Sequence, residues 1–419
     1  MPRRPVQVAT IILAGGQGTR LFPLTVHHSK PAVSYGGRYR LIDIPISNSI
    51  NSDFRQMFVI AQYLSAELEH HISQTYHFDP FNPGSVDVLT PQENEKGEKQ
   101  WFNGTADAVR KNLPTILKSD ADYFLILSGD QLYNINFQSM LTFAIEKNAD
   151  LTIASTPVPQ KHAKRMGLLK IDEAGKVLEF VEKPQEDEHL KHFELSSSEA
   201  PHYLGSMGIY VFRRESLVSL LQGDQRDDFG FHLITTAVKE KKTYAFLYTG
   251  YWEDIGTVSS YYEANLMLTE EKKGLDTYDE TNPIYARPTY LPGPRIESTK
   301  IFQSIICEGC IIEAEEIRHS VIGLRSRIRS GTVIRDTVMM GNQLYMPPLH
   351  QGKPLKADFS VGKNCLITKA IIDEHVQIGD NVKLVNEKKL DHYDGEGIFI
   401  RDGIIIVVAG TIIPSGFQL

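Results

Sequence analysis

An aliphatic residue recurs about every sixth position through the last third of the chain, and this repeat limits the fold more than any other feature. The spacing is clear in two runs: Val321, Ile328 and Ile334, then Val361, Ile367 and Ile372. No helical period fits this stretch. Such a repeat is typical of a parallel β-helix, in which three repeats make one coil and the coils stack their aliphatic side chains. An irregular all-β domain is the alternative, and the number of repeats favours the β-helix.

The first 270 residues have a different pattern, in which short apolar runs alternate with helical stretches. The runs are "VATIIL" (8–13), "MFVIAQ" (57–62), "YFLILS" (123–128), "DLTIAS" (150–155), "GIYVFR" (208–213) and "TYAFLY" (243–248). This alternation predicts an α/β domain with a Rossmann-like, mixed but mostly parallel sheet. Both "LAGGQG" and "LSGD" directly follow a predicted strand, so we expect them at the same edge, where such sheets bind ligands.

A proline-rich stretch separates these two patterns. Pro283, Pro288, Pro292 and Pro294 lie close together, and proline removes backbone donors and fixes φ. We therefore expect a catalytic domain at 1–273, a linker at 274–295 and a β-helix domain at 296–419. A chain of 419 residues is long enough for two or three domains.

Composition excludes several classes of protein. The net charge of −8 argues against nucleic-acid binding, and no run approaches the roughly 18 apolar residues of a membrane span. The "VATIILAG" run lacks a cleavage-like site, so we interpret it as a strand and not as a signal peptide. Three cysteines fit a reducing compartment. We expect the cytoplasm, with a plastid left open if a transit peptide has been removed. The Cys307 and Cys310 pair has only Cys365 as a third thiol, so we predict packed side chains and no zinc site.

The segment "LAGGQGTRLFPLT" (13–25) is a candidate phosphate cradle. Gly15, Gly16 and Gly18 allow backbone N–H groups to approach a phosphate closely. Arg20 offers a fork-shaped cation, and Thr19 offers a hydroxyl. The segment is neither a Walker A loop nor a GxGxxG motif. From spacing alone, a tight turn without chemistry therefore remains open.

The continuation "LAGGQGTRLFPLTVHHSKPAV" resembles the signature of the sugar-1-phosphate nucleotidyltransferases. The segments "YRLIDIPISNSINSDFRQMFVIAQY", "WFNGTADAVRKNLP", "LSGDQLY", "FVEKP", "SMGIYVF" and "GYWEDIGTVSSYYEANL" look like those of the members that make ADP-glucose. The resemblance extends to "HSVIGLRSRI" and "RDGIIIVV" and so covers nearly the whole chain. It implies that the β-helix is left-handed.

The resemblance implies transfer of the adenylyl group of ATP to glucose 1-phosphate, giving ADP-glucose and pyrophosphate, the committed step towards glycogen or starch. In-line attack on the α-phosphorus needs cations, a metal and positioning, with no covalent nucleophile. Arg20 and Lys30 fit the β- and γ-phosphates. Asp130 and Asp254 fit the carboxylates that hold Mg²⁺ near the α-phosphate.

Further site residues are implied by the same resemblance. The expected ATP-binding residues are Leu13, Ala14, Gly15, Gly16, Gly18, Thr19, Gln62, Trp101, Gly104 and Thr105. The expected glucose-1-phosphate-binding residues are Gly167, Glu182, Lys183, Ser206, Tyr210, Asp228 and Trp252. Taken alone, Asp130 is more simply explained as a turn residue or a helix cap, Lys183 as a solvated loop lysine and Trp101 as a core side chain.

Regulation and assembly are also expectations from the resemblance, which implies a homotetramer controlled by small anionic effectors. The candidate effector residues are His27, Arg40, Arg55, Lys388 and Lys389. His27 and Ala409 occupy positions where relatives carry a lysine, so we expect weak activation. A histidine is mostly neutral at pH 7, so any effect through His27 should strengthen as the pH falls. The His27–His28 pair has no acidic or cysteine neighbour in the sequence, which favours a surface location over metal binding.

Two alternatives to ADP-glucose synthesis remain. The chain could make a UDP-, dTDP- or GDP-sugar, or it could be a non-catalytic regulatory subunit of the same fold. Losses at the phosphate and metal positions would indicate a regulatory subunit. Arg20, Lys30, Asp130, Lys183 and Asp254 are all present, which favours an enzyme.

Overall fold

The computed structural model describes residues 5–93, 99–195, 202–271, 274–345 and 360–419. The chain divides into two compact units. The first consists of Met1–Gly16 and Ile44–Trp252, and the second of Gln17–Asp43 and Glu253–Leu419. Within the described ranges, no helix has the length and apolar character needed to cross a membrane.

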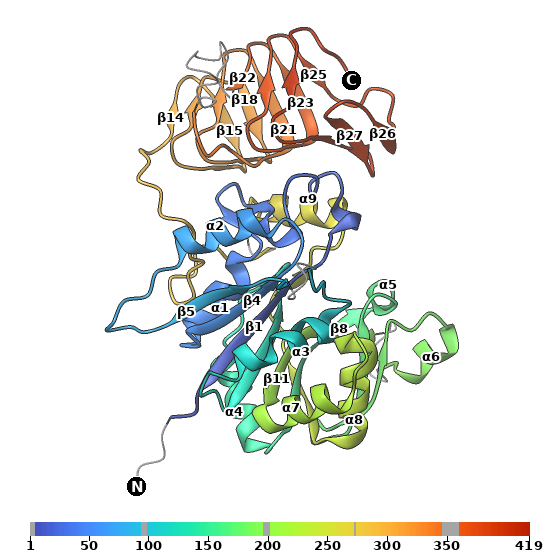
Figure 1. Cartoon of the computed structure of the whole chain (residues 1–419). Coiled ribbons are helices and arrows are strands. Elements are labelled where there is room, and N and C mark those ends of the chain that lie inside the picture. Colours follow the sequence, from blue (N-terminus) through green and yellow to red (C-terminus); the bar gives the residue numbers. More distant parts are fainter. Residues whose placement is uncertain (1–4, 94–98, 196–201, 272–273, 346–359) are drawn as a thin grey trace. The chain divides into compact units, whose positions relative to one another are not determined.

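A mixed β-sheet forms the centre of the first unit (Figure 1). Its strands are β1 (Val8–Ala14), β4 (Gln56–Ala61), β5 (Ser85–Leu89), β6 (Tyr123–Ser128), β8 (Leu151–Pro159), β9 (Gly167–Ile171), β10 (Val177–Glu182), β11 (His202–Arg213) and β12 (Thr243–Leu247). The order is β10-β9-β11-β6-β1-β4-β5, and β8 pairs with β11 and β12. Strand β11 is antiparallel to β6, β8 and β9, and β10 is antiparallel to β9. The other strands point one way, which confirms the mostly parallel sheet.

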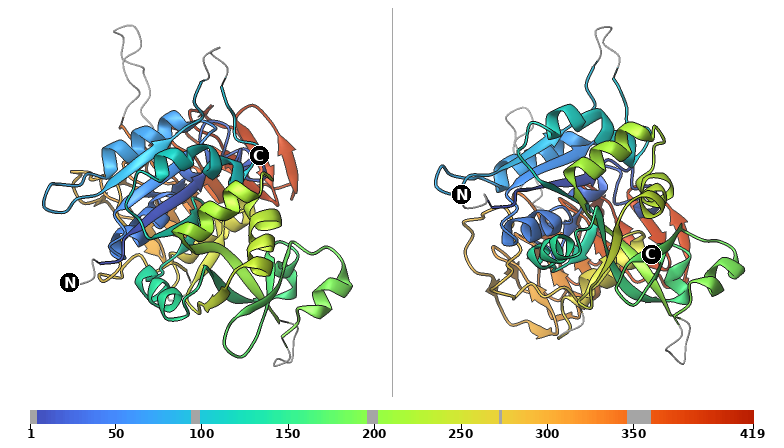
Figure 2. Two further views of the ribbon diagram at one scale, coloured as in Figure 1. Left: turned by 60° about the horizontal axis from the view of Figure 1, so that its bottom comes forward. Right: turned by 90° about the horizontal axis from the view of Figure 1, so that it is seen from below.

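Helices cover both faces of this sheet. The named helices of the unit are α1 (Asp43–Asn51), α2 (Ser65–Thr75), α3 (Thr105–Ile116), α4 (Phe137–Glu146), α5 (Gln160–Ala163), α6 (Asp187–His192), α7 (Arg214–Gly223), the π-helix η3 (Phe229–Ile234) and α8 (Thr235–Glu240). Helices α3, α7 and α8 share one core with the sheet, and α3 lies beside α7 (Figure 2). Phe143 of α4 packs on Tyr244 and Phe246 of β12, whose neighbour Ala245 belongs to the core beneath α3 and α8. Helix α4 therefore covers the opposite face.

The second unit contains a parallel β-helix. Its strands are β14 (Arg295–Ile296), β15 (Lys300–Phe302), β16 (Ile305–Ile306), β17 (Ile311–Ile312), β18 (Glu316–Arg318), β19 (Val321–Ile322), β20 (Arg327–Ile328), β21 (Val333–Met339), β22 (Ser360–Val361), β23 (Leu366–Ile372), β24 (Gln377–Ile378), β25 (Lys383–Leu384), β26 (His392–Asp394), β27 (Ile398–Arg401), β28 (Ile404–Val407) and β29 (Ile412–Ile413). Strands β26 and β27 add an antiparallel hairpin to β28. The unit also holds α9 (Val258–Met267), the short helices η1 (Thr19–Leu21) and η2 (Lys30–Ala32), and the strands β2 (Ser34–Tyr35) and β3 (Tyr39–Arg40). Two further strands flank candidate site residues: β7 (Gln131–Tyr133), which belongs to the first unit, and β13 (Trp252–Asp254), which begins at the last residue of the first unit.

Aliphatic columns run through the β-helix because equivalent residues of successive coils pair in parallel register. One column is Ile301, Ile317, Ile334, Ile367 and Leu384, and another is Ile312, Ile328, Val361, Ile378 and Ile413. The six residues that indicated the repeat are all buried. The β-helix prediction is confirmed, and the irregular all-β alternative is wrong.

One corner of the β-helix uses left-handed backbone. His319, Asp336 and Lys369 follow equivalent strand residues in three successive coils, and their φ angles are 45°, 44° and 51°. Side chains other than glycine rarely adopt this region, so each coil stores some strain where it turns.

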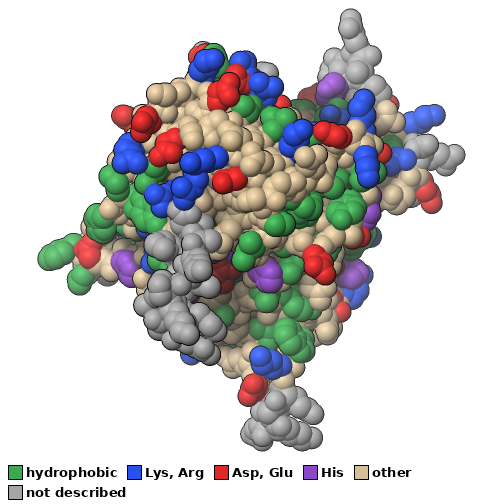
Figure 3. Space-filling model, turned by 90° about the horizontal axis from the view of Figure 1, so that it is seen from above, with side chains coloured by type: hydrophobic (Ala, Val, Ile, Leu, Met, Phe, Trp, Pro, Cys, Tyr) green, Lys and Arg blue, Asp and Glu red, His purple; other side chains and the backbone are tan. Residues whose placement is uncertain are grey.

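The three cysteines are packed side chains, as predicted, and charges of both signs share the surface in view. The three thiols are buried, and burial raises the pKa of Cys307 and of Cys310 to about 12, so both pack as neutral side chains. On the face in Figure 3, basic and acidic side chains are interspersed, and no large patch of one sign dominates.

Candidate functional site

The ends of β1 and β6 bring the glycine segment and Asp130 to one sheet edge, as predicted. Leu13 of β1 lies opposite Ser128 of β6 in parallel register. The Gly129 N–H donates to the Leu13 carbonyl over 3.0 Å. Gly15 and Asp130 therefore leave the sheet side by side, which is the usual position of a ligand site in such sheets.

Gln62 adds a third strand end to this edge. It follows β4, whose Ala61 pairs with Ala14, and a Cβ on Gly15 would lie 3.7 Å from the Gln62 Cβ. The Gln62 side chain accepts a hydrogen bond from the Phe102 N–H over 2.5 Å. Gln62 therefore tethers the segment that leads into α3.

Trp101 lies in that segment and is not a core residue, since its side chain is 47% exposed. Its ring stacks on Tyr63 with 5.6 Å between centroids and 16° between planes. The core interpretation is therefore wrong for this residue. An exposed, pre-oriented aromatic ring offers a flat surface on which a nucleotide base could stack.

The first turn of α3 borders the same edge. Gly104 occupies the N-cap position, and a Cβ there would lie 2.5 Å from the Asp227 carbonyl oxygen. Only glycine allows this close approach. Thr105 begins the helix, and its hydroxyl accepts a hydrogen bond from the Phe229 N–H over 2.9 Å. The Ala106 and Asp107 N–H groups both donate to the Asp227 carbonyl, over 2.7 and 3.3 Å, so the first turn of α3 is joined to the segment that leads to Asp228.

Asp130 lies in the turn between β6 and β7 and is partly buried, with the Ser128 hydroxyl donating to its carboxylate. The interpretation of Asp130 as a turn residue is therefore correct, and the turn lies at the edge of the sheet where ligands are expected to bind. Carboxylate oxygens suit Mg²⁺, which needs few protein ligands because it keeps water and substrate phosphates. Asp130 offers one such carboxylate, and the described residues contain no group of three or more metal-ligating side chains.

Glu182 marks a second part of the site, among β9, β10 and η3. It pairs with Gly167, where a Cβ would come within 2.7 Å of its carboxylate. Burial raises the pKa of Glu182, and the neighbouring Lys183 opposes that shift. The Lys183 Nζ lies 3.2 Å from the Glu182 carboxylate and 5.5 Å from the ring centre of Phe231. Although half exposed, Lys183 is therefore held in place.

Tyr210 and Asp228 lie close to this carboxylate, and Ser206 is a hydrogen-bond partner of Tyr210. Burial raises the pKa of Tyr210, and the charges of Glu182 and Asp228 act in the same direction, whereas a hydrogen bond with Ser206 opposes them. The Asp228 carboxylate caps η3 by accepting from the Phe231 N–H over 2.9 Å. These polar groups are the kind that bind sugar hydroxyls.

Gln131 and Gly208 connect the two parts. A Cβ on Gly208 would lie 3.4 Å from the Gln131 side-chain nitrogen, and Gln131 directly follows Asp130. The Trp252 indole N–H lies 3.5 Å from the Gln131 side-chain oxygen. Trp252 therefore lies beside Gln131, the residue that follows Asp130 in the chain.

The remaining catalytic candidates belong to the second unit. Gly18 has a φ of 65°, and a Cβ there would lie 2.9 Å from the Lys30 Cβ. Lys30 is buried. Arg20 is exposed, with its guanidinium 3.6 Å from the Cβ that an alanine would have at Gly256. Thr19 and Asp254 are also exposed.

The candidate effector residues are divided between the two units. Arg55 belongs to the first unit and the others to the second. Lys388 and Lys389 are exposed, as is His27. Arg40 is buried, and its guanidinium donates to the Ala32 carbonyl and lies 3.8 Å from Glu374.

His28 corrects the prediction of a surface pair. Its side chain is only 11% exposed, and its Nε2 lies 4.0 Å from the Asp373 carboxylate. This acidic neighbour is distant in the sequence, so spacing could not reveal it.

A charged set on α3 escaped the sequence analysis. Lys111 donates to the Trp101 carbonyl over 2.7 Å and lies 2.8 Å from Asp107, whose carboxylate accepts from the Asn103 N–H over 2.9 Å. Arg110 lies one position before Lys111 on the same helix. An acidic residue followed three and four positions later by basic residues, directly after "NGTA", is a signal that could have indicated this set.

Comparison with protein-family models gives two matches. A model described as nucleotidyl transferase matches residues 9–271. A second model, described as the GLGC left-handed parallel β-helix domain, matches residues 289–417.

Proposed function

Because the chain belongs to the nucleotidyl transferase family and has the domain architecture of the ADP-glucose pyrophosphorylases, a group of sugar-1-phosphate nucleotidyltransferases, we propose that it transfers the adenylyl group of ATP to glucose 1-phosphate. The observation that carries the proposal is the convergence of Gly15, Gln62 and Asp130 at one sheet edge. The partly buried Glu182, with its adjacent lysine, supports a sugar phosphate as the second substrate.

In the proposed mechanism, the protein binds and orients two anions and does not itself form a covalent bond. The Gly15–Gly16 backbone faces the nucleotide, and the Trp101 ring supports its base. Arg20 and Lys30 neutralise the β- and γ-phosphates, which favours pyrophosphate as the leaving group.

On the sugar side, Lys183 binds the phosphate whose oxygen attacks the α-phosphorus. Glu182, Ser206 and Asp228 orient the hexose, with Gly167 leaving room for the carboxylate and Tyr210 and Trp252 completing the walls. Positioning of this kind accounts for much of the rate in reactions between two bound substrates.

Asp130 and Asp254 are the proposed carboxylate ligands of Mg²⁺. When bound, the metal would neutralise charge that builds up on the phosphate oxygens. The Ser128 hydroxyl fixes the orientation of the Asp130 carboxylate for this role.

The test is pyrophosphate release with glucose 1-phosphate and each of ATP, UTP, dTTP and GTP, with the sugar nucleotide identified by mass spectrometry. We expect the highest kcat/KM with ATP. A higher value with another triphosphate would assign the chain to a different sugar nucleotide. Turnover of none of them, by a protein that still binds ATP, would indicate the regulatory subunit.

A further inference from the structure

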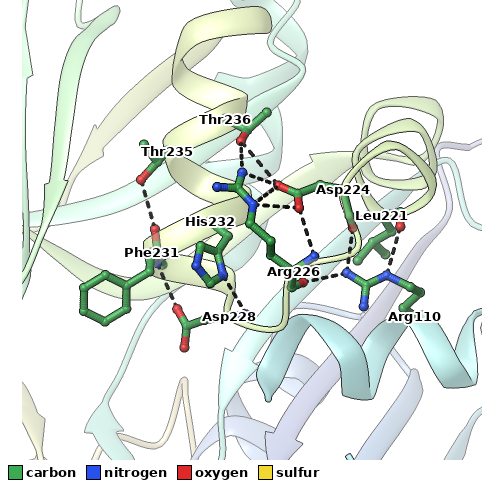
Figure 4. A network of polar contacts seen from close by, with 10 residues as sticks. Arg110, Leu221, Asp224, Arg226, Asp228, Phe231, His232, Thr235 and Thr236 are labelled. Carbon is green, nitrogen blue, oxygen red and sulfur yellow. Dashed lines mark hydrogen bonds and ion pairs between the residues drawn. The ribbon is translucent and has the colours of Figure 1, made fainter. Parts of the chain in front are cut away.

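Arg110 of α3 holds the segment 224–228, which ends at the candidate sugar-binding residue Asp228 (Figure 4). Its Nε donates to the Leu221 carbonyl over 3.0 Å. Its Nη2 donates to the carbonyls of Asp224 and Arg226 over 2.7 and 2.8 Å. A planar guanidinium can satisfy several carbonyls in fixed directions, which the single ammonium of a lysine cannot do.

Other contacts make the segment rigid along its length. Arg226 forms an ion pair with Asp224 at 2.6 Å, and its hydrogen bonds lower the pKa of Asp224 to about 2. The Ala106 N–H in the first turn of α3 donates to the Asp227 carbonyl over 2.7 Å. One helix therefore fixes both ends of the segment, through Arg110 and through Ala106.

The position of the segment matters because it sets the geometry around Glu182. Asp228 caps η3, and a Cβ on Gly230 of η3 would lie 2.7 Å from the Glu182 carboxyl carbon. A shift of the segment would therefore move Asp228 and the η3 backbone against Glu182. The neighbouring Phe229 donates a hydrogen bond to Thr105 in the first turn of α3, and Thr105 is a candidate ATP-binding residue.

We propose that Arg110 is a positioning residue, which keeps the glucose-1-phosphate side of the site in register with the first turn of α3. This inference rests on the proposed function. The hydrogen bonds of Arg110 go to backbone carbonyls, and its ion pair goes to Asp107, which is not a candidate substrate-binding residue. Its effect on Asp228 therefore passes through the 224–228 backbone.

Arg214 provides a matched control. It also donates to three backbone carbonyls, those of Leu117, Ser119 and Ala121, over 2.8 to 3.0 Å. These carbonyls follow the last turn of α3, at the opposite end from Thr105. Replacing either arginine with methionine removes three comparable hydrogen bonds, and R110M also removes the 3.5 Å ion pair with Asp107. Only the change at Arg110 releases the segment that carries Asp228.

The experiment measures KM for each substrate and kcat in R110M, R110K and R214M. We expect R110M to raise the KM for glucose 1-phosphate by about tenfold while the KM for ATP changes less than threefold. R110K, which keeps the cation, should fall between R110M and the wild type. R214M should change neither KM. Equal changes in both KM values, or the same profile in R110M and R214M, would overturn the proposal, and R110K decides the question if R110M does not fold.

Hydrogen–deuterium exchange supplies a readout that does not depend on activity. R110M should exchange faster in peptides covering 222–234, and R214M in those covering 117–122. Unchanged exchange at 222–234 in R110M would overturn the positioning role even in an inactive protein. Absence of turnover in the wild type would instead contradict the proposed function, so the two failures are distinguishable.

Discussion

Asp130 is the residue on which the proposed metal chemistry depends most. Asp130→Asn keeps the size of the side chain and removes its charge, so the turn between β6 and β7 should persist. We expect kcat to fall by about a hundredfold or more, because the charge would act in the transition state. Steady-state kinetics across Mg²⁺ concentrations, with circular dichroism as a folding check, tests this. A smaller loss in a normally folded variant would contradict the metal role.

Lys183 should act mainly in binding. Lys183→Gln keeps a polar, unbranched side chain that is one bond shorter and removes its cation. The KM for glucose 1-phosphate should rise about tenfold or more, since a hydrogen bond to a charged group contributes roughly 1.5–3 kcal/mol. Lys170→Gln on β9 is the control, because the Lys170 Nζ lies 3.6 Å from Glu179 and 3.3 Å from His192, neither of which is a candidate site residue. An unchanged KM in Lys183→Gln would remove this residue from the site.

Asp373 gives the β-helix unit a pH dependence. Burial raises the pKa of its carboxyl to about 6, with nearby Glu374 adding to the shift and His28 opposing it. The raised pKa means that the folded protein holds this proton more tightly than the unfolded chain. The stabilisation is present at low pH and is lost as the pH rises through about 6.

The Asp373→Asn side chain cannot ionise, so the variant does not lose this stabilisation as the pH rises. The difference in free energy of unfolding, variant minus wild type, should therefore increase by about 1 kcal/mol from pH 5 to pH 7.5. Denaturant unfolding at both pH values measures this. Asp402→Asn, at an exposed position of the same unit, is the control. A difference between variant and wild type that does not change with pH would contradict the expected titration.

Residues that follow a strand could be located from the sequence, and residues paired over long distances could not. Gly15 and Asp130 were predictable because parallel neighbours end at one edge. Arg40, His28 and Arg110 have partners more than a hundred positions away in Glu374, Asp373 and the 224–228 segment, and no local pattern encodes such contacts.

At the scale of elements, the columns of the β-helix should dominate its stability. Ile334 is fully buried between Ile317 and Ile367 in the coils on either side. Ile334→Ala should cost about 2–5 kcal/mol through lost burial and the cavity that remains. Leu178→Ala on β10 is the control, because that side chain is 52% exposed. Calorimetry that shows equal losses for the two variants would contradict a continuous packed column.

The existence of most elements was predictable, but the direction of some strands was not. Each predicted apolar run became a strand, and the repeat fixed the β-helix. The reversed β10 and β11 depend on how the connections cross the sheet, which periodicity does not encode. The π-helix η3 also has no distinct sequence signal, and its start depends on the cap supplied by Asp228.

At the scale of the whole molecule, we expect a homotetramer. The edge strands β14 and β29 of the six-stranded sheet in the described β-helix carry Ile296 and Ile412, whose side chains are 43% and 68% exposed. Apolar side chains on unpaired strand edges favour association. Sedimentation velocity at micromolar concentration should give a species of four chains, and a stable monomer would contradict this expectation.

The paired columns have a consequence for engineering the chain. Ile312 pairs with Ile328, sixteen positions on, whereas Ile328 pairs with Val361, thirty-three positions on, and Val361 with Ile378, seventeen positions on. The coil after Ile328 therefore accommodates an additional stretch of sequence while the pairing resumes in register. Side chains, and not chain length, set the alignment of each coil. A tag or a reporter peptide inserted between residues 345 and 360 should for this reason leave the coils before and after it aligned.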